Sequence, residues 1–131
     1  MGKSCHANVL DAALQYLETN VDFISVCEGE PTTYEHAHSN KGTATGKVLA
    51  SSATPTFTGP VAGDGGGSSR KTAVDEEATI TVDVSGDADH IALVFVGSTL
   101  LLYVTTCALQ TLTAANTVTI PSWDVEIGTP T

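Results

Sequence analysis

The chain has 131 residues, 15 acidic and 5 basic side chains, and a formal net charge of -10 at pH 7. Its length suits one domain, and a composition of 41% hydrophobic and 15% charged residues argues against intrinsic disorder. The acidic charge argues against a nucleic-acid binder and against an anionic membrane surface, since both recruit Lys and Arg. No apolar run approaches the roughly 20 residues of a membrane helix, so we expect neither nucleic acid nor a membrane as a partner.

The three cysteines, Cys5, Cys27 and Cys107, form no CxxC pair and leave one thiol over. A small disulfide scaffold uses more cysteines, in an even number. No continuous apolar stretch follows the first three residues that would mark a secretory signal. We therefore expect the chain to be made in a reducing cytoplasm, and a Cys27–Cys107 disulfide would require two adjacent strands.

Residues 8–20 have the apolar spacing of a short amphipathic helix. The apolar stripe consists of Val9, Leu10, Ala13, Leu14 and Leu17. The residues expected on the solvent side are Asp11, Gln15 and Glu18, and the expected N-cap is Asn8. A helix this short persists only if it docks, and a sheet is the expected docking surface.

The rest of the chain predicts strands and turns. The predicted strands are residues 22–27, 47–51, 56–58, 78–84, 90–96, 99–106, 116–120 and 123–127. Residues 90–96 are apolar on both faces and predict a central strand, whereas residues 123–127 alternate between inward apolar and outward acidic side chains.

These elements predict a mainly β protein, a β-sandwich or jelly roll of about eight short strands with one N-terminal α-helix. We expect a single domain over residues 1–131, with the helix at about 8–20 and the sandwich at about 22–128. Residues 31–46 are polar and residues 59–69 are glycine-rich, so both are expected to be flexible loops.

The candidate chemical groups do not assemble into a recognisable site. His36 and His38 lie in a polar loop without a second cluster at metal-ligand spacing. His90 opens an apolar strand, and neither Cys27 nor Cys107 has a basic residue nearby in the sequence to activate a thiolate. We therefore expect no enzyme, no metal and no cofactor.

The strand-rich part of the chain resembles a known kind of protein. The segments that carry the resemblance are residues 86–107 (GDADHIALVFVGSTLLLYVTTC), residues 112–127 (LTAANTVTIPSWDVEI), residues 8–37 with LDAALQYLETN and VCEGEPTTYEHA, and Ser69-Arg70-Lys71. They resemble small β-rich proteins encoded among the virion genes of tailed bacteriophages, in particular capsid decoration or cement proteins. The resemblance implies a module that binds the outer surface of the major capsid protein shell and stabilises it, without a catalytic residue.

The implied location is the capsid surface of the virion, after synthesis in the host cytoplasm, and we expect a homo-oligomer, a dimer or a trimer. Flexible loops can order on a partner, so we expect the interface at the two loops and the amphipathic helix. The predicted interface residues are Gly63, Asp64, Gly65, Gly66, Gly67 and Arg70 from one region, and Tyr34, His36 and His38 from the other.

Two other classes of function stay open at this stage. The chain could occupy a neck or tail position, or be a receptor- or carbohydrate-binding β-sandwich in which Trp123 or one of the tyrosines stacks on a sugar. Its inward strand neighbours favour a core position for Trp123 instead. The third class is a thiol or metal hydrolase, with Cys107 or His90 as its reactive group.

Overall fold

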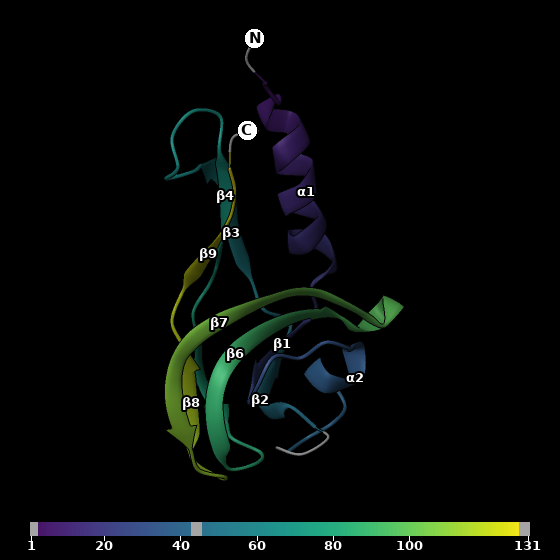
Figure 1. The fold of residues 1–131 in the computed structure, drawn as a ribbon, viewed down its shortest axis with the longest axis vertical. Coiled ribbons are helices and arrows are strands. Elements are labelled where there is room, and N and C mark those ends of the chain that lie inside the picture. Colours follow the sequence, from purple (N-terminus) through teal and green to yellow (C-terminus); the bar gives the residue numbers. More distant parts are fainter. Residues whose placement is uncertain (1–2, 43–45, 129–131) are drawn as a thin grey trace. The chain divides into compact units, whose positions relative to one another are not determined.

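The computed structural model describes residues 3–42 and 46–128. The chain forms two compact units, each built from separate stretches of sequence. Unit 1 comprises Met1–Asn20, Thr56–Glu76 and Pro121–Thr131, and unit 2 comprises Val21–Pro55 and Glu77–Ile120. The colours of Figure 1 follow the chain through both units.

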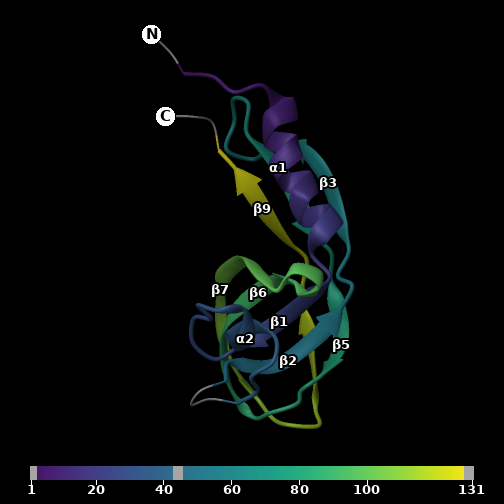
Figure 2. The same cartoon turned by 90° about the vertical axis from the view of Figure 1, so that its right-hand side faces the viewer.

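Unit 1 is a three-stranded antiparallel sheet with one helix packed on one of its faces (Figure 1). Its elements are α1 (Ala7–Asn20), β3 (Phe57–Ala62), β4 (Arg70–Val74) and β9 (Trp123–Ile127), and the strand order is β3-β4-β9. Leu10, Leu14, Val74 and Val125 are buried and supply its apolar core. The start of α1, the β3–β4 loop and the end of β9 gather at one end of this unit (Figure 2).

Unit 2 consists of two antiparallel sheets. Its elements are β1 (Phe23–Cys27), α2 (Tyr34–Ala37), β2 (Val48–Ala53), β5 (Glu77–Thr81), β6 (Gly86–Phe95), the 3-10 turn η1 (Val96–Ser98), β7 (Leu100–Leu112) and β8 (Thr117–Ile120). Four strands form one sheet in the order β2-β1-β6-β7, and β5 pairs with β8. A bridge between Ala50 and Val82 joins the two sheets along β2, and Ile24, Leu49 and Leu93 are fully buried.

The mainly β fold with one N-terminal helix is confirmed. The apolar segment predicted as a central strand lies in β6, between β1 and β7. β9 has the predicted bounds, with Val125 buried and Asp124 and Glu126 exposed. The jelly-roll topology stays a prediction.

The β6–β7 hairpin is longer than the sequence predicts, because its ladder runs on to a pairing of Gly86 with Leu112. Ala88 pairs with Gln110 and His90 with Thr106, so three residues of β7 face one residue of β6. This bulge breaks the alternation of inward and outward side chains at the point where the prediction ended β7.

The predicted solvent side of the helix is wrong for two of its three residues. Arg70 donates from Nε and Nη2 to the Asp11 carboxylate at 2.7 and 3.2 Å. The Thr72 hydroxyl donates to Glu18 at 2.6 Å. Both carboxylates face the sheet because β4 presents a cation and a hydroxyl group to α1, and the sequence of the helix alone does not contain that information.

The apolar stripe of the helix also differs from its prediction. Val9 and Ala13, which the periodicity assigns to the apolar stripe, are exposed, and Gln15 is exposed as expected. The helix begins at Ala7, and the Asn8 N–H donates to Nδ1 of His6 at 3.1 Å, so Asn8 is not the N-cap.

The first predicted loop, residues 31–46, contains one turn of helix. This turn is α2, and its N-cap Thr33 accepts a hydrogen bond from the His36 N–H at 3.2 Å. A hydroxyl at this position satisfies a backbone donor that a short helix otherwise leaves open. Residues 43–45 of this loop lie outside the described residues.

The second predicted loop, residues 59–69, begins inside a strand. Residues 59–62 belong to β3, whose register against β4 shifts between Thr58 and Val61. This irregularity accommodates a Gly-Pro pair within an edge strand, where a missing N–H donor is tolerated. The Gly-Pro pair therefore led to the prediction of a loop at residues 59–62, although these residues belong to a strand that pairs with β4.

Candidate partner-binding loops

The loop between β3 and β4, residues 63–69, folds back on itself. The Gly63 N–H donates to the Ser69 carbonyl at 2.8 Å, and the Ser69 N–H donates to the Gly66 carbonyl at 3.2 Å. We call this segment the glycine loop. It holds all the predicted interface residues of unit 1 except Arg70, and it has a defined, hydrogen-bonded shape.

Glu126 of β9 holds the glycine loop from a neighbouring strand. Its Oε1 accepts a hydrogen bond from the Gly65 N–H at 2.7 Å. This bond is the main reason that the pKa of Glu126 lies below its ordinary value, and the Asp64 N–H and the Ser69 hydroxyl act in the same direction. The hydrogen bonds of the loop therefore favour the charged form of this carboxylate.

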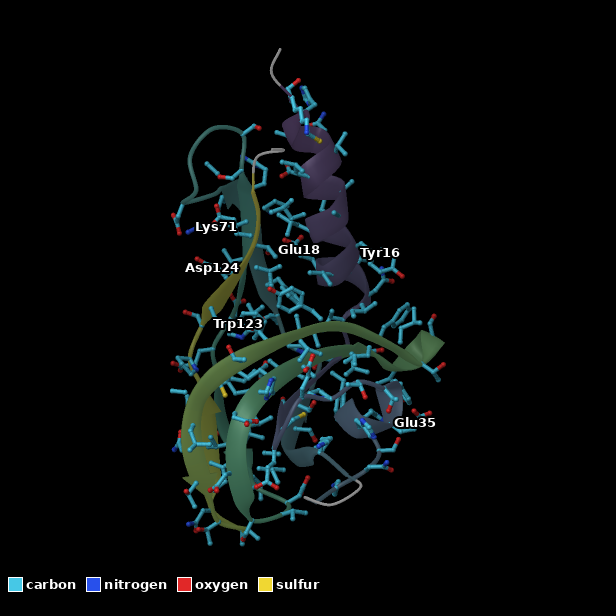
Figure 3. The ribbon with its side chains drawn as sticks, in the orientation of Figure 1. Tyr16, Glu18, Glu35, Lys71, Trp123 and Asp124 are labelled. Carbon is cyan, nitrogen blue, oxygen red and sulfur yellow. The ribbon has the colours of Figure 1, made fainter. Side chains whose placement is uncertain are left out.

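Lys71 of β4 ties the loop to the sheet a second time. Its ammonium group lies 2.8 Å from Asp64 in the loop and 3.1 Å from Asp124 on β9. The hydrogen bonds to Asp64 and then to Asp124 raise the pKa of Lys71. Figure 3 shows Lys71 and Asp124 on the side of the strands away from α1. One exposed ion pair is worth little, but this cation connects three segments.

Glycine is required at several places in this loop. Gly66 and Gly67 have φ angles of 74° and 60°, in the left-handed region that residues with a Cβ rarely adopt. A Cβ at Gly63 would collide with the Glu126 carboxylate and the Ser69 hydroxyl. The glycines on which the prediction of a flexible loop rests thus allow a tight turn, and the Glu126 carboxylate lies directly against the backbone of this turn.

Arg70 does not belong to the same surface. Neighbouring residues of a strand point to opposite faces of the sheet, so Arg70 faces α1 while Lys71 faces away from it. Besides its two bonds to Asp11, Arg70 donates to the Pro60 carbonyl at 3.4 Å. The structure thus gives Arg70 a packing role beneath the helix.

The remaining predicted interface residues, Tyr34, His36 and His38, lie in unit 2. The His38 ring stacks on Tyr34 with 4.9 Å between ring centroids and lies 4.6 Å from the Phe23 ring. His36 Nδ1 lies 3.3 Å from the Thr32 hydroxyl. The two imidazoles thus contact their own loop and strand β1 in unit 2, whereas the glycine loop belongs to unit 1.

The thiol and imidazole groups of unit 2 are built into its sheet. Cys27 is fully buried, and burial raises its pKa to about 11. Burial also raises the pKa of Cys107. β6 lies between β1, which carries Cys27, and β7, which carries Cys107, so the two cysteines are not on adjacent strands. Cys5, Cys27 and Cys107 are all free thiols. A raised pKa keeps both thiols of unit 2 protonated near neutral pH, where a nucleophile needs a thiolate.

Asp89 connects this sheet to the loop that follows β1. Its Oδ1 accepts from the Gly29 N–H at 2.7 Å and lies 2.8 Å from Nδ1 of His90. The hydrogen bond with His90 is the main cause of the lowered pKa of Asp89, and the Gly29 N–H adds to it. The Asp89–His90 pair thus fixes a loop in place.

The sequence prediction missed the residues that shape the glycine loop: Lys71, Asp124 and Glu126. The alternation in residues 123–127 placed both acids outward, which is correct. It could not show that β9 pairs with β4, a strand about fifty positions earlier in the chain, since that pairing is long-range.

Comparison with known proteins gave no relatives. No protein-family model matches the chain, and no match was found among curated proteins or among solved structures.

Within residues 3–42 and 46–128, no three side chains of His, Cys, Asp or Glu are placed to hold a metal ion. None of the helices in the same part of the chain is long and apolar enough to cross a membrane.

Proposed function

We propose that this chain is a structural protein of a tailed-bacteriophage virion, a capsid decoration or cement protein. In this role it binds the outer surface of the major capsid protein shell and stabilises it. The class comes from the sequence resemblance. The structural observation that carries the proposal is the glycine loop, whose backbone is held in one shape by Glu126 and Lys71.

A held loop favours binding because little conformational entropy is lost when a partner docks on it. The Asp64 side chain is 76% exposed although it pairs with Lys71, so the loop presents an acidic group and a bare glycine backbone to its surroundings. Such a surface suits recognition by backbone hydrogen bonds and by a basic or polar partner patch. The proposed docking surface is therefore preformed and mildly acidic.

The proposal also accounts for how the reactive residue types are used. Cys27 is buried with a protonated thiol, and the Asp89 carboxylate binds the Gly29 N–H and His90. These groups hold the fold together, as a binding module requires. We accordingly propose that the chain acts by binding and not by catalysis.

Binding stabilises the shell by mass action, because a ligand that prefers the assembled state shifts the equilibrium toward it. Many copies on a repeating surface add avidity to individually weak contacts. The net charge of -10 opposes nonspecific aggregation of the chain before it reaches the shell. Capsid subunits, in this proposal, are the partner.

The first experiment is to count copies of the chain per purified particle by quantitative mass spectrometry. A count comparable to that of the major capsid protein supports the proposal. A count equal to one small ring or a few fibres contradicts the capsid position and assigns the chain to the neck or tail. Absence from particles contradicts a structural role.

A second experiment tests the glycine loop in binding to purified shells. Gly63→Val puts a side chain against Glu126, whereas a Cβ at Gly128, in the same unit, meets nothing within 4 Å. We expect Gly63→Val to weaken shell binding by tenfold or more, a loss of about 1.4 kcal/mol, and Gly128→Val to bind as the unmodified chain. Circular dichroism checks that both variants are folded. Equal binding by the two folded variants contradicts the role of the loop.

A further inference from the structure

The side of α1 that faces away from the sheet is uncharged. The two acidic residues of the helix point inward, where Asp11 binds Arg70 and Glu18 binds Thr72. The exposed residues of α1 are Asn8, Val9, Ala12, Ala13, Gln15, Tyr16 and Thr19. An ordinary surface helix carries its charged side chains on the outer side, whereas α1 carries them on the packed side together with Leu10 and Leu14.

Two large apolar side chains stand out on this side. Val9 is 61% exposed and Tyr16 is 49% exposed, and Figure 3 shows Tyr16 directed away from the strands. With Ala12 they occupy positions i, i+3 and i+7, which lie on one line along a helix. We call Val9, Ala12 and Tyr16 the outer stripe.

We propose that the outer stripe binds the same stripe of a second copy of this chain, with the two α1 helices antiparallel about a two-fold axis. An axis that passes between Ala12 and Ala13 places Val9 of one copy opposite Tyr16 of the other. The alanines at the crossing point allow the helices to approach closely, and the larger residues fill the space on either side of it. The stripe is thus complementary to itself in size.

Charge favours association of two copies through this side of α1 over association through other, acidic parts of their surfaces. The chain has 15 acidic and 5 basic residues, and Lys41, Arg70 and Lys71 already pair with carboxylates of the same chain. Two copies of so acidic a chain are therefore repelled wherever acidic surfaces meet. The uncharged side of α1 is a surface at which two such chains can approach without a direct clash of carboxylates.

The expected dimer is weak. The stripe covers two helical turns, roughly 10 Å of helix, and one helix pair of that length buries less than the roughly 1,600 Å² of a stable interface. We expect a dissociation constant on the order of tens to hundreds of micromolar. The proposal does not depend on the proposed role at a capsid.

The test is sedimentation equilibrium of the full chain from about 10 µM to 1 mM, with two variants that each add one carboxylate to an exposed position of α1. Ala12→Glu places the charge at the centre of the outer stripe, and Gln15→Glu places it on the flank of the helix. We expect the unmodified chain and Gln15→Glu to approach the mass of a dimer at the highest concentration. Ala12→Glu should weaken association by tenfold or more, with an unchanged helical circular dichroism spectrum.

Three results overturn the proposal. The first is an unmodified chain that stays monomeric over the whole range. The second is a dimer that Ala12→Glu and Gln15→Glu weaken equally, since a dimer through another surface responds only to net charge. The third is a trimer, which excludes a two-fold axis through α1.

Discussion

At the scale of single residues, two carboxylates with lowered pKa values, Asp89 and Glu126, hold backbone in place. The carboxylates of Asp89 and Glu126 each accept from a glycine N–H in a turn, and Lys71 bridges Asp64 and Asp124. Glycine amides are accessible from many directions because no Cβ shields them, so acids beside glycine-rich turns are well suited to fixing them. The acidic composition therefore has a structural use in addition to solubility.

Cys27 provides a pH-dependent test at this scale. Its thiol has a pKa of about 11 in the folded chain against an ordinary 9.0, so the unfolded chain releases the proton first as pH rises. The contribution of Cys27 to stability is fully present below pH 9 and is lost as pH rises through 11. We expect the stability difference between the unmodified chain and Cys27→Ala to shrink by up to about 2 kcal/mol between pH 8 and pH 11.

Urea unfolding of both proteins at several pH values measures this difference, and the alanine variant controls for every other group that titrates in the range. A difference that stays constant from pH 8 to pH 11 contradicts the buried, protonated thiol.

At the scale of elements, α1 shows how a helix can have polar anchors on its packed side. Leu10 and Leu14 supply apolar burial, while the Asp11–Arg70 pair lies beside them with side chains 19% and 24% exposed. A two-bond contact between a guanidinium and a carboxylate fixes direction as well as distance. It therefore sets the rotation of α1 about its own axis over β4.

A double-mutant cycle tests this anchor. Asp11→Ala and Arg70→Ala should each destabilise the chain by about 1–2 kcal/mol, and their coupling should be about 1 kcal/mol because the pair is shielded and makes two bonds. The matched control is Lys41–Asp83, whose side chains are 51% and 35% exposed. We expect a coupling below about 0.5 kcal/mol there.

Thermal or urea unfolding followed by the helical circular dichroism signal measures all the variants. Equal coupling in the two pairs would show that Asp11–Arg70 is only a surface contact.

The sequence predicted where helices and strands lie better than which elements contact one another. The periodicity of residues 8–20 and 123–127 located α1 and β9 to within one residue. It failed for the orientation of Asp11, because the cation that draws this carboxylate inward lies at position 70. The site prediction had the same limit: glycine composition found the loop, whereas Glu126, which shapes it, comes from a strand near the other end of the chain.

At the scale of the whole molecule, the chain passes between the two units four times, because unit 1 is assembled from three stretches and unit 2 from two. β9 pairs only with β4 among the described strands, and Val125 is 4% exposed. Removing residues 121–131, or replacing Val125 with Asp in the full chain, should therefore unfold unit 1 and leave unit 2 folded.

Hydrogen exchange measured amide by amide tests this prediction. Protection should be lost in β4 and kept in β1 and β6, with Gly128→Ala, an exposed change just after the same strand, as the control. Simultaneous loss of protection in β4, β1 and β6 would show that the two units unfold as one.

The place of β9 in the sheet order also has a consequence for the order of synthesis. α1 leaves the ribosome before the strands it packs on, and the sheet that receives it is complete only when residues 123–127 have emerged. Unit 2, which ends at Ile120, can close earlier. During translation, the inner leucines of α1 therefore stay without their complete sheet until β9 has been made.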